Sequence, residues 1–330
     1  MNIVTYLTDP TCAPMFLPAF VAAPALAILC GLLTSLVVLK RMAFIGQGVS
    51  HAAFGGIGVW AILVFTLGGA ASGIGSGVAS DTGRFVIVAV FCVAAALGIG
   101  LLSERRTRGG HGGVPASTRA NTTSAESESS SSRRGTTVGG VGLEADTAIG
   151  IILVAAMALG AVLIKASYTT QSWESFLFGS IWSIGWADAI LAWATTLATG
   201  VTLLIARRPL IFWAYDESGA RAFGISTRGV RATLMVLLAI ATVVAMKLAG
   251  VVLATALLVV PGAAAIAASR RLARVMTLGV VFAIVGVMGG LVVSVETDLL
   301  PGPSIVGVLL VLLVIPAMAR AINSRRTNHA

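Results

Sequence analysis

Two polar side chains, Gln47 and His51, stand four residues apart in an apolar stretch of the chain, RMAFIGQGVSHAAFGGIG. Residues four apart share one face of a helix, and Ser50 lies beside that face. A neutral imidazole is a good ligand for Zn, Mn or Fe, and a side-chain amide oxygen is a weaker and harder one. Because polar groups deep in a membrane-spanning helix are costly, they are candidates for function. We therefore treat His51, Gln47 and Ser50 as candidate metal ligands, with a histidine hydrogen-bonded between helices as the structural alternative.

A second polar group, Glu296 and Asp298, follows a long apolar run in VSVETDLLPGPS. Carboxylates at the mouth of a pore attract cations and coordinate hard or borderline metals. The pattern therefore predicts an acidic entrance for a cation. Two solvated loop acids without a functional role are the alternative.

A third group lies in a more polar segment, RRPLIFWAYDESGARAFGIS. Asp216 and Glu217 suit the first turn of a short helix, where negative charge meets the positive end of the helix dipole. Gly224 suits the position that ends such a helix. A short helix in a loop between spans is a natural docking point for a soluble partner, and an ordinary interfacial helix is the alternative.

The composition identifies the elements that must position these residues. Of 330 residues, 57% are hydrophobic and only 11% are charged, whereas soluble domains carry about a quarter charged residues. Several apolar runs reach the roughly 20 residues that a helix needs to cross a bilayer, and backbone groups in lipid must satisfy one another. We expect an all-α integral membrane protein, a polytopic bundle of eight or nine transmembrane helices. The expected spans are 16–39, 44–67, 85–102, 148–165, 186–206, 230–248, 251–269, 275–293 and 304–322.

The net charge of +9 is a topology signal. With these spans, all but three of the 22 Lys and Arg residues fall in loops or at the ends of spans on one side, and the exceptions are Arg84, Lys165 and Lys247. The side rich in positive charge is cytoplasmic, which predicts an N-terminus outside and a C-terminus inside. This distribution argues against a nucleic-acid partner and indicates that the chain is embedded in a lipid bilayer.

We expect one transmembrane permease domain over residues 1–330. Residues 103–146, rich in Ser, Gly, Thr and Arg, offer little to bury and are expected to form a disordered cytoplasmic loop. The segment from Lys165 to Asp188 is too short and polar to span, and its tryptophans favour an interfacial or re-entrant segment. This segment leaves the span count at eight or nine.

The chain contains no phosphate-binding loop of the GxxxxGK[ST] type, because none of its three lysines follows a glycine. It also contains no HExxH or GxSxG motif. We therefore expect a transport subunit rather than an enzyme, with ATP hydrolysis supplied by another chain if the transport is ATP-driven.

The chain resembles the ABC-3 family, the membrane subunits of zinc, manganese and iron importers. The stretches that carry the resemblance are RMAFIGQGVSHA, SWESFLFGSIWSI, YDESGARAFGIS, VVLATALLVVPGAAA and DLLPGPSIVGVL, in this order. The resemblance implies a fold similar to type II ABC importer permeases, in a bacterial inner membrane. It also implies a homodimer, a cytoplasmic ABC ATPase as partner, and an extracytoplasmic metal-binding protein that delivers the ion.

The resemblance further implies roles for individual residues. Family members usually carry Asp four residues before the histidine that His51 matches, whereas this chain has Gln47, which removes a charge. Some members have polar ligands in the region of Glu296 and Asp298. The loop that fits a groove of the ATPase would present Tyr215, Asp216, Glu217, Arg221, Phe223 and Gly224.

Together these features predict the permease subunit of an ATP-driven importer of Mn, Zn or Fe, with the metal as cargo and no permanently bound cofactor. One alternative is a permease for a siderophore or corrinoid, in which His51 would be structural. A second is an ATP-independent metal channel or secondary transporter, which would often show internal repeats.

Overall fold

The computed structural model describes residues 13–40, 42–68, 80–109, 145–166, 179, 181, 184–269 and 271–327. Within these ranges the regular elements are all helical, which confirms the expected fold class. Eight of the described helices are long and apolar enough to cross a membrane. The helices are α2 (Ala13–Leu39), α3 (Ala43–Gly68), α5 (Asp81–Gly109), α6 (Ala145–Ala166), α8 (Trp186–Ile205), α9 (Arg207–Tyr215), α10 (Glu217–Ala222), α11 (Thr227–Ala268), α12 (Leu272–Thr297) and α13 (Pro301–Thr327).

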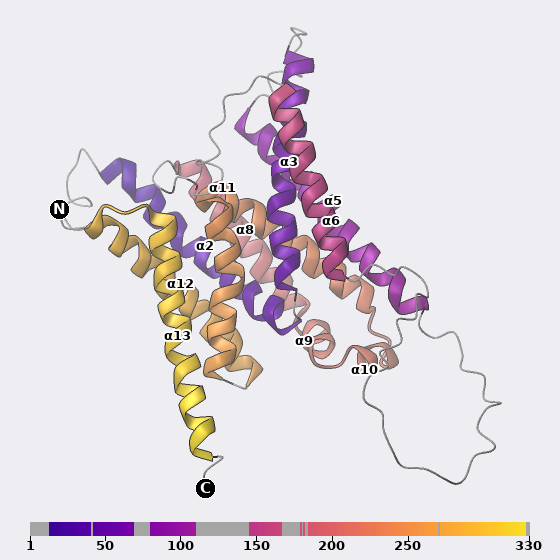
Figure 1. Ribbon diagram of the computed structural model, residues 1–330, viewed down its shortest axis with the longest axis vertical. Helices are drawn as coiled ribbons and strands as arrows, with labels where there is room; N and C mark the ends of the chain where they lie inside the picture. The colour runs from indigo at the N-terminus through magenta and orange to yellow at the C-terminus, as the bar shows by residue number, and fades with distance from the viewer. Residues whose placement is uncertain are drawn as a thin grey trace, which may run out of the picture.

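The helix α11 is two helices joined by a sharp kink. Its 42 residues would extend about 63 Å if straight, roughly twice the thickness of the hydrocarbon core. Gly250 interrupts the helix with φ 79° and ψ 169°, and the two halves run in clearly different directions in Figure 1. The halves correspond to the separate spans expected at 230–248 and 251–269. The eight apolar helices therefore include two of the nine expected spans as the single helix α11, whereas the segment from Lys165 to Asp188, which left the expected count open, lies mostly outside the described residues.

The kink is braced by the segment that precedes α8. Gly179 also has a positive φ, of 64°, and a side chain there would collide with the backbone of Ala249 and Gly250. Two glycines are therefore needed where these backbones meet, because only glycine adopts positive φ without steric cost. The nearby Ile181 and Ile184 are buried. Most of the segment expected to be interfacial or re-entrant lies outside the described residues, and that expectation stays a prediction.

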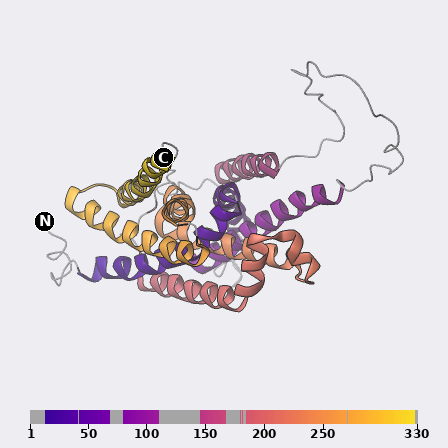
Figure 2. The same cartoon turned by 90° about the horizontal axis from the view of Figure 1, so that it is seen from below.

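The helices form three groups, seen in Figures 1 and 2. α2, α8 and α11 occupy the middle, α12 and α13 lie on one side, and α3, α5 and α6 lie on the other. α2 packs against α8, α11 and α12, while α3 packs against α5, α6 and α11. Most residues of α2 and α11 are buried, whereas α6 and α13 expose apolar side chains, as is expected where helices face lipid.

Hydrogen bonds between helices hold the central group together. Thr34 Oγ1 of α2 accepts a hydrogen bond from the amide of Gly262 in α11 at 2.9 Å, directly after Pro261. On the other side of α2, the indole of Trp193 and the hydroxyl of Thr196, both in α8, donate to backbone carbonyls of α2. Such bonds stabilise helix association where lipid offers no other polar partner.

The boundaries of α5 and α6 bear on the expected disordered loop. α5 continues to Gly109, beyond the expected start of the loop, and α6 begins at Ala145. Residues 110–144 lie outside the described residues, so disorder there stays a prediction.

Candidate functional site

The candidate ligands Gln47 and His51 lie one turn apart on α3, about one and two turns from its N-terminal end. Gln47 is exposed and His51 is half-buried, whereas the intervening Val49 is fully buried. The two polar side chains therefore share the less covered face of the helix, as the four-residue spacing predicted. Both lie within a segment long and apolar enough to span a membrane.

Ser50 is placed differently from these two residues. Its side chain is fully buried, and its hydroxyl donates to the carbonyl oxygen of Gln47 at 2.9 Å. A hydroxyl bonded back to its own helix is a common arrangement for Ser within helices. Ser50 is thus on the packed side of α3 rather than on the face that carries Gln47 and His51.

The face with His51 continues into a tight seam between α3 and α6. Phe54 packs against Gly160 so closely that a side chain at Gly160 would collide with it. One turn further, a Cβ at Gly58 would lie 2.9 Å from the Cα of Gly160. Small residues let helices approach in this way and fix their relative position. His51 therefore lies at the end of a closely packed, well-positioned helix pair.

The carboxylates Glu296 and Asp298 lie at the C-terminal end of α12, and both are exposed. Asp298 has φ 53° and ψ 28°, the left-handed conformation that often ends a helix. The hydroxyl of Ser294 donates to the carbonyl of Leu299 at 2.6 Å and closes this end. The carboxylates thus extend from a helix terminus.

The structure does not bring the two candidate groups together. α12 packs against α2, α11 and α13, whereas α3 belongs to the group on the other side of the bundle, as Figure 1 shows. Among the described residues of this single chain, no cluster of three or more His, Cys, Asp or Glu side chains is suited to hold a metal ion.

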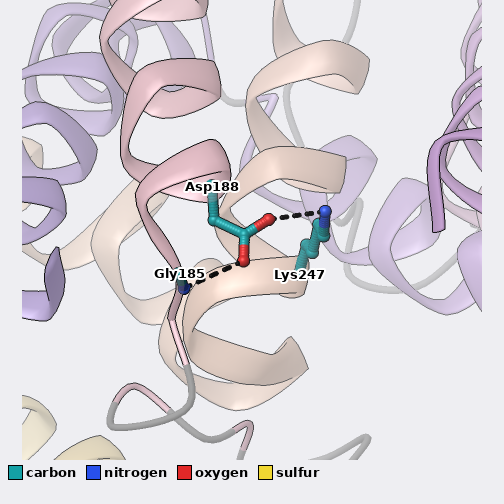
Figure 3. A network of polar contacts seen from close by, with 3 residues as sticks. All are labelled: Gly185, Asp188 and Lys247. Carbon is teal, nitrogen blue, oxygen red and sulfur yellow. Dashed lines mark hydrogen bonds and ion pairs between the residues drawn. The ribbon is translucent and has the colours of Figure 1, made fainter. Parts of the chain in front are cut away.

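Another carboxylate, Asp188 at the start of α8, forms an ion pair with Lys247 of α11 (Figure 3). The Lys247 Nζ lies 2.6 Å from Asp188 Oδ1, and each side chain is only 25% exposed. Asp188 Oδ2 accepts a hydrogen bond from the amide of Gly185 at 3.3 Å. The pair joins the N-terminus of α8 to α11 three residues before the kink at Gly250. Its charge is therefore balanced within the bundle, unlike that of an open acidic mouth.

The short helix expected in the polar loop is present as α10. Asp216 caps it, since Oδ1 accepts a hydrogen bond from the amide of Gly219 at 3.0 Å. Gly224 has φ 76°, and the amide of Ile225 bonds to the carbonyl of Ala220, which is the usual glycine-based helix end. The expected start and stop signals are thus confirmed.

The surface of this loop is aromatic. Phe223, at the end of α10, is 78% exposed and makes an edge-to-face contact with Phe212 of α9, with ring centroids 5.4 Å apart. The side chains of Tyr215, Glu217 and Arg221 lie outside the described part of the structure.

Sequence reasoning missed two contacts that the structure reveals. One is the Asp188–Lys247 ion pair, and the other is a contact between Lys40 and Trp213, whose ring centroid lies 4.2 Å from the lysine Nζ. In the sequence, Lys40 is one of the many basic residues that indicate the cytoplasmic side, and Trp213 is 1% exposed although its segment is short and polar. A tryptophan in such a segment was the one available signal.

Comparison with known proteins extends these observations. The model of the ABC 3 transport family matches residues 13–109 and 141–320. The manganese transport system membrane protein MntC of Halalkalibacterium halodurans is 27% identical over 309 residues, covering 93% of this chain and 88% of that protein. The chelated iron transport system membrane protein YfeD of Yersinia pestis is 25% identical over 310 residues, covering 93% and 86%.

The fold is similar to that of a chain in the structure of PsaBC from Streptococcus pneumoniae in complex with Fab. The TM-score is 0.70 at 23% sequence identity, and the match covers 95% of each chain. The family match includes α3 with Gln47 and His51, the α9–α10 loop and the C-terminal end of α12.

Proposed function

Because this chain belongs to the ABC 3 transport family, we propose that it is the membrane-spanning permease subunit of an ATP-driven importer of divalent transition-metal ions, Mn, Zn or Fe. The relatives are named for manganese and chelated iron transport, and the described chain has eight helices suited to crossing a membrane. Cargo, partners and site residues follow as parts of this proposal.

The observation that carries the proposal is the Gln47–His51 pair. An exposed amide and a half-buried imidazole within a membrane-spanning helix are unfavourable against lipid. They are stable if the part of α3 that carries them, N-terminal to the seam with α6, lines an aqueous path or is covered by a second copy of the chain. In either case a passing ion meets one imidazole nitrogen and one amide oxygen. Such a neutral, sparse ligand set binds weakly enough to release its cargo.

Glu296 and Asp298 supply the other end of the proposed path. With the N-terminus outside, the C-terminal end of α12 lies on the outer side and α10 on the cytoplasmic side. Both carboxylates are exposed, so they attract cations to the entrance without holding them. Ser50 stays in the proposed site as a support for the α3 backbone at Gln47, since its hydroxyl bonds to that carbonyl.

The partners follow from the cytoplasmic surface. The capped helix α10, with the exposed ring of Phe223, offers a rigid projection for docking on a separate ABC ATPase in a bacterial inner membrane. Tyr215, Asp216, Glu217, Arg221 and Gly224 complete the proposed docking segment. An extracytoplasmic metal-binding protein would deliver the ion to a homodimer of this chain.

The experiment is metal accumulation in cells that express the chain with its candidate ATPase, measured by elemental analysis. We expect His51→Ala to abolish ATPase-dependent accumulation of the transported metal, because the imidazole is the strongest ligand of the pair. Thr66→Ala is the matched control, since it removes a polar group at the far end of α3 whose hydroxyl bonds back to the carbonyl of Ile62. The amount of each variant in the membrane is measured in parallel.

Normal accumulation by His51→Ala would remove this residue from the path. If no free metal accumulates while the complex forms and hydrolyses ATP, the cargo is a metal chelate or corrinoid. Metal uptake that persists without the ATPase would instead identify a channel or secondary transporter.

A further inference from the structure

The indole of Trp213 is buried without satisfying its polar atom. Trp213 lies in α9 and is 1% exposed, yet its Nε1 has no hydrogen-bond partner within the described structure. A buried donor left unpaired is unfavourable, and phenylalanine or leucine would fill the space without that cost. The presence of an indole therefore calls for another interaction that depends on the aromatic ring.

Lys40 provides this interaction. Its Nζ lies 4.2 Å from the centroid of the Trp213 ring, well within the range of a cation–π contact. Tryptophan has the most favourable ring face for a cation, which explains an indole at a site that offers its N–H no partner. Lys40 is half-buried, so water screens this contact less than it would screen a surface pair.

The two residues join parts of the chain that are far apart in sequence. Lys40 is in the short turn between α2 and α3, and Trp213 is in the helix directly before the docking helix α10. Figure 1 shows α9 beside the junction of α2 and α3. In addition, α9 packs against its sequence neighbours α8 and α10 and against α11.

Packed contacts and helical segments then connect the docking helix α10 to the candidate metal ligands without a flexible link. The Phe212–Phe223 contact fastens the end of α10 to α9, and Trp213 is the next residue of α9. Lys40 is three residues before α3 begins at Ala43, and His51 lies about 12 Å further along this helix. The α3 segment between them is held by buried side chains such as Ile45 and Val49.

We propose that the Lys40–Trp213 contact transmits displacement of the α9–α10 loop to α3, and so to Gln47 and His51. The inference rests on the proposed function, because it requires an ATPase docked on α10. Lys40 and Trp213 are positioning residues: they touch neither ATP nor metal, and they set how closely ATP hydrolysis is tied to movement of the ligand-bearing helix. Loss of the contact leaves the loop free to move without α3.

The test uses the full complex with its ATPase in proteoliposomes. ATP hydrolysis and uptake of Mn²⁺ and Zn²⁺ are measured together, and the readout is the number of ions taken up per ATP hydrolysed. Lys40→Met removes the charge and keeps the apolar stem, while Lys40→Arg keeps a cation. Trp213→Leu removes the aromatic face, while Trp213→Phe keeps one and eliminates the unpaired donor. Lys165→Met is the control, since Lys165 is an exposed lysine at the end of α6.

We expect Lys40→Met and Trp213→Leu each to lower the ion-to-ATP ratio at least threefold, with ATP hydrolysis within twofold of the wild type. Lys40→Arg, Trp213→Phe and Lys165→Met should keep the ratio. The double variant with Met at residue 40 and Leu at residue 213 should be no worse than Lys40→Met alone, because the second change then removes a contact that is already broken.

Two results would overturn the inference. One is an unchanged ratio in Lys40→Met, and the other is a parallel fall of uptake and hydrolysis, which indicates loss of ATPase docking or of folding. Lys40→Met decides the question if Trp213→Leu does not accumulate in the membrane. Failure of the wild-type complex to form or to take up metal would contradict the proposed function instead, and is thus distinguishable.

Discussion

Asp298 allows its backbone role and its charge to be tested separately. The residue ends α12 in the left-handed conformation, with φ 53°, and its carboxylate is exposed. Substitution by Gly, Asn or Ala removes the charge in each case. Glycine adopts the left-handed conformation freely, asparagine adopts it at a small cost, and alanine adopts it at a larger cost. The three variants therefore lose the same charge but differ in how well they fit the helix end.

The electrostatic effect is modest because the site is exposed. In water, a divalent ion about 5 Å from one carboxylate is attracted by about 1.7 kcal/mol. Physiological salt, with a Debye length of about 8 Å, reduces this to about 0.9 kcal/mol. This corresponds to an increase of about fourfold in the local concentration of the ion.

The three variants should differ in stability, although they lose the same charge. A side chain in the left-handed region costs about 1–2 kcal/mol relative to glycine, and less for Asn and Asp than for Ala. We expect thermal stability in detergent to be highest for Asp298→Gly and lowest for Asp298→Ala, with the wild type and Asp298→Asn between them.

The assay is the concentration dependence of Mn²⁺ uptake by the reconstituted complex. If the carboxylate attracts ions, all three variants should need about fourfold more metal for half-maximal uptake. The difference should shrink at high salt, and the maximal rate should be kept in Asp298→Gly and Asp298→Asn. Uptake that follows the stability order instead, with Asp298→Gly equal to the wild type, would refute an electrostatic role and leave Asp298 as a helix cap.

Two further predictions concern the start of α8 and the kink of α11. Lys247→Met leaves the Asp188 carboxylate, which is three-quarters covered, without its cation, and should lower the free energy of unfolding by about 1–3 kcal/mol. Adding Asp188→Asn should recover part of this loss. A double variant that unfolds at a lower temperature than Lys247→Met in a thermal melt would contradict this account. Gly179→Ala should lower the midpoint of the same melt, because it places a methyl group against the kink of α11 on a residue with a positive φ. Gly150→Ala, at an open helical position of α6, should not lower it. Equal midpoints for the two alanine variants would show that the kink tolerates the methyl group.

The sequence predicted those helices and helix ends that are marked by residues close together in the chain. Apolar runs located the membrane-spanning helices, and Asp216 and Gly224 marked the start and end of α10. Within the long apolar run of α11, the expected spans are divided at Gly250, where the structure has its kink. These features depend on residues close together in the chain, and their physics is local.

The contacts that connect helices could not be predicted in the same way. Lys40 and Trp213 are more than 170 residues apart, and neither stands in a pattern that indicates the other. Asp188 and Lys247 both suited an outer surface, yet nothing in the sequence indicated that they pair. Ser50 shows the same limit within one helix. Its spacing placed it beside the candidate ligands, but the packing of α3 against its neighbours buries it, and its hydroxyl bonds to the backbone.

The amide at Gln47 bears directly on how a transported ion would leave the site. The family resemblance implies aspartate at this position, and an ionised carboxylate exposed within a membrane span is costly whenever no cation balances it. Metal binding would relieve that cost, so a carboxylate favours the occupied state. An amide carries no charge, and the empty site is then comparatively stable. With His51 as the main ligand, the substitution favours release over retention. The ATP-driven movement of α3 would then have less binding energy to overcome in each cycle.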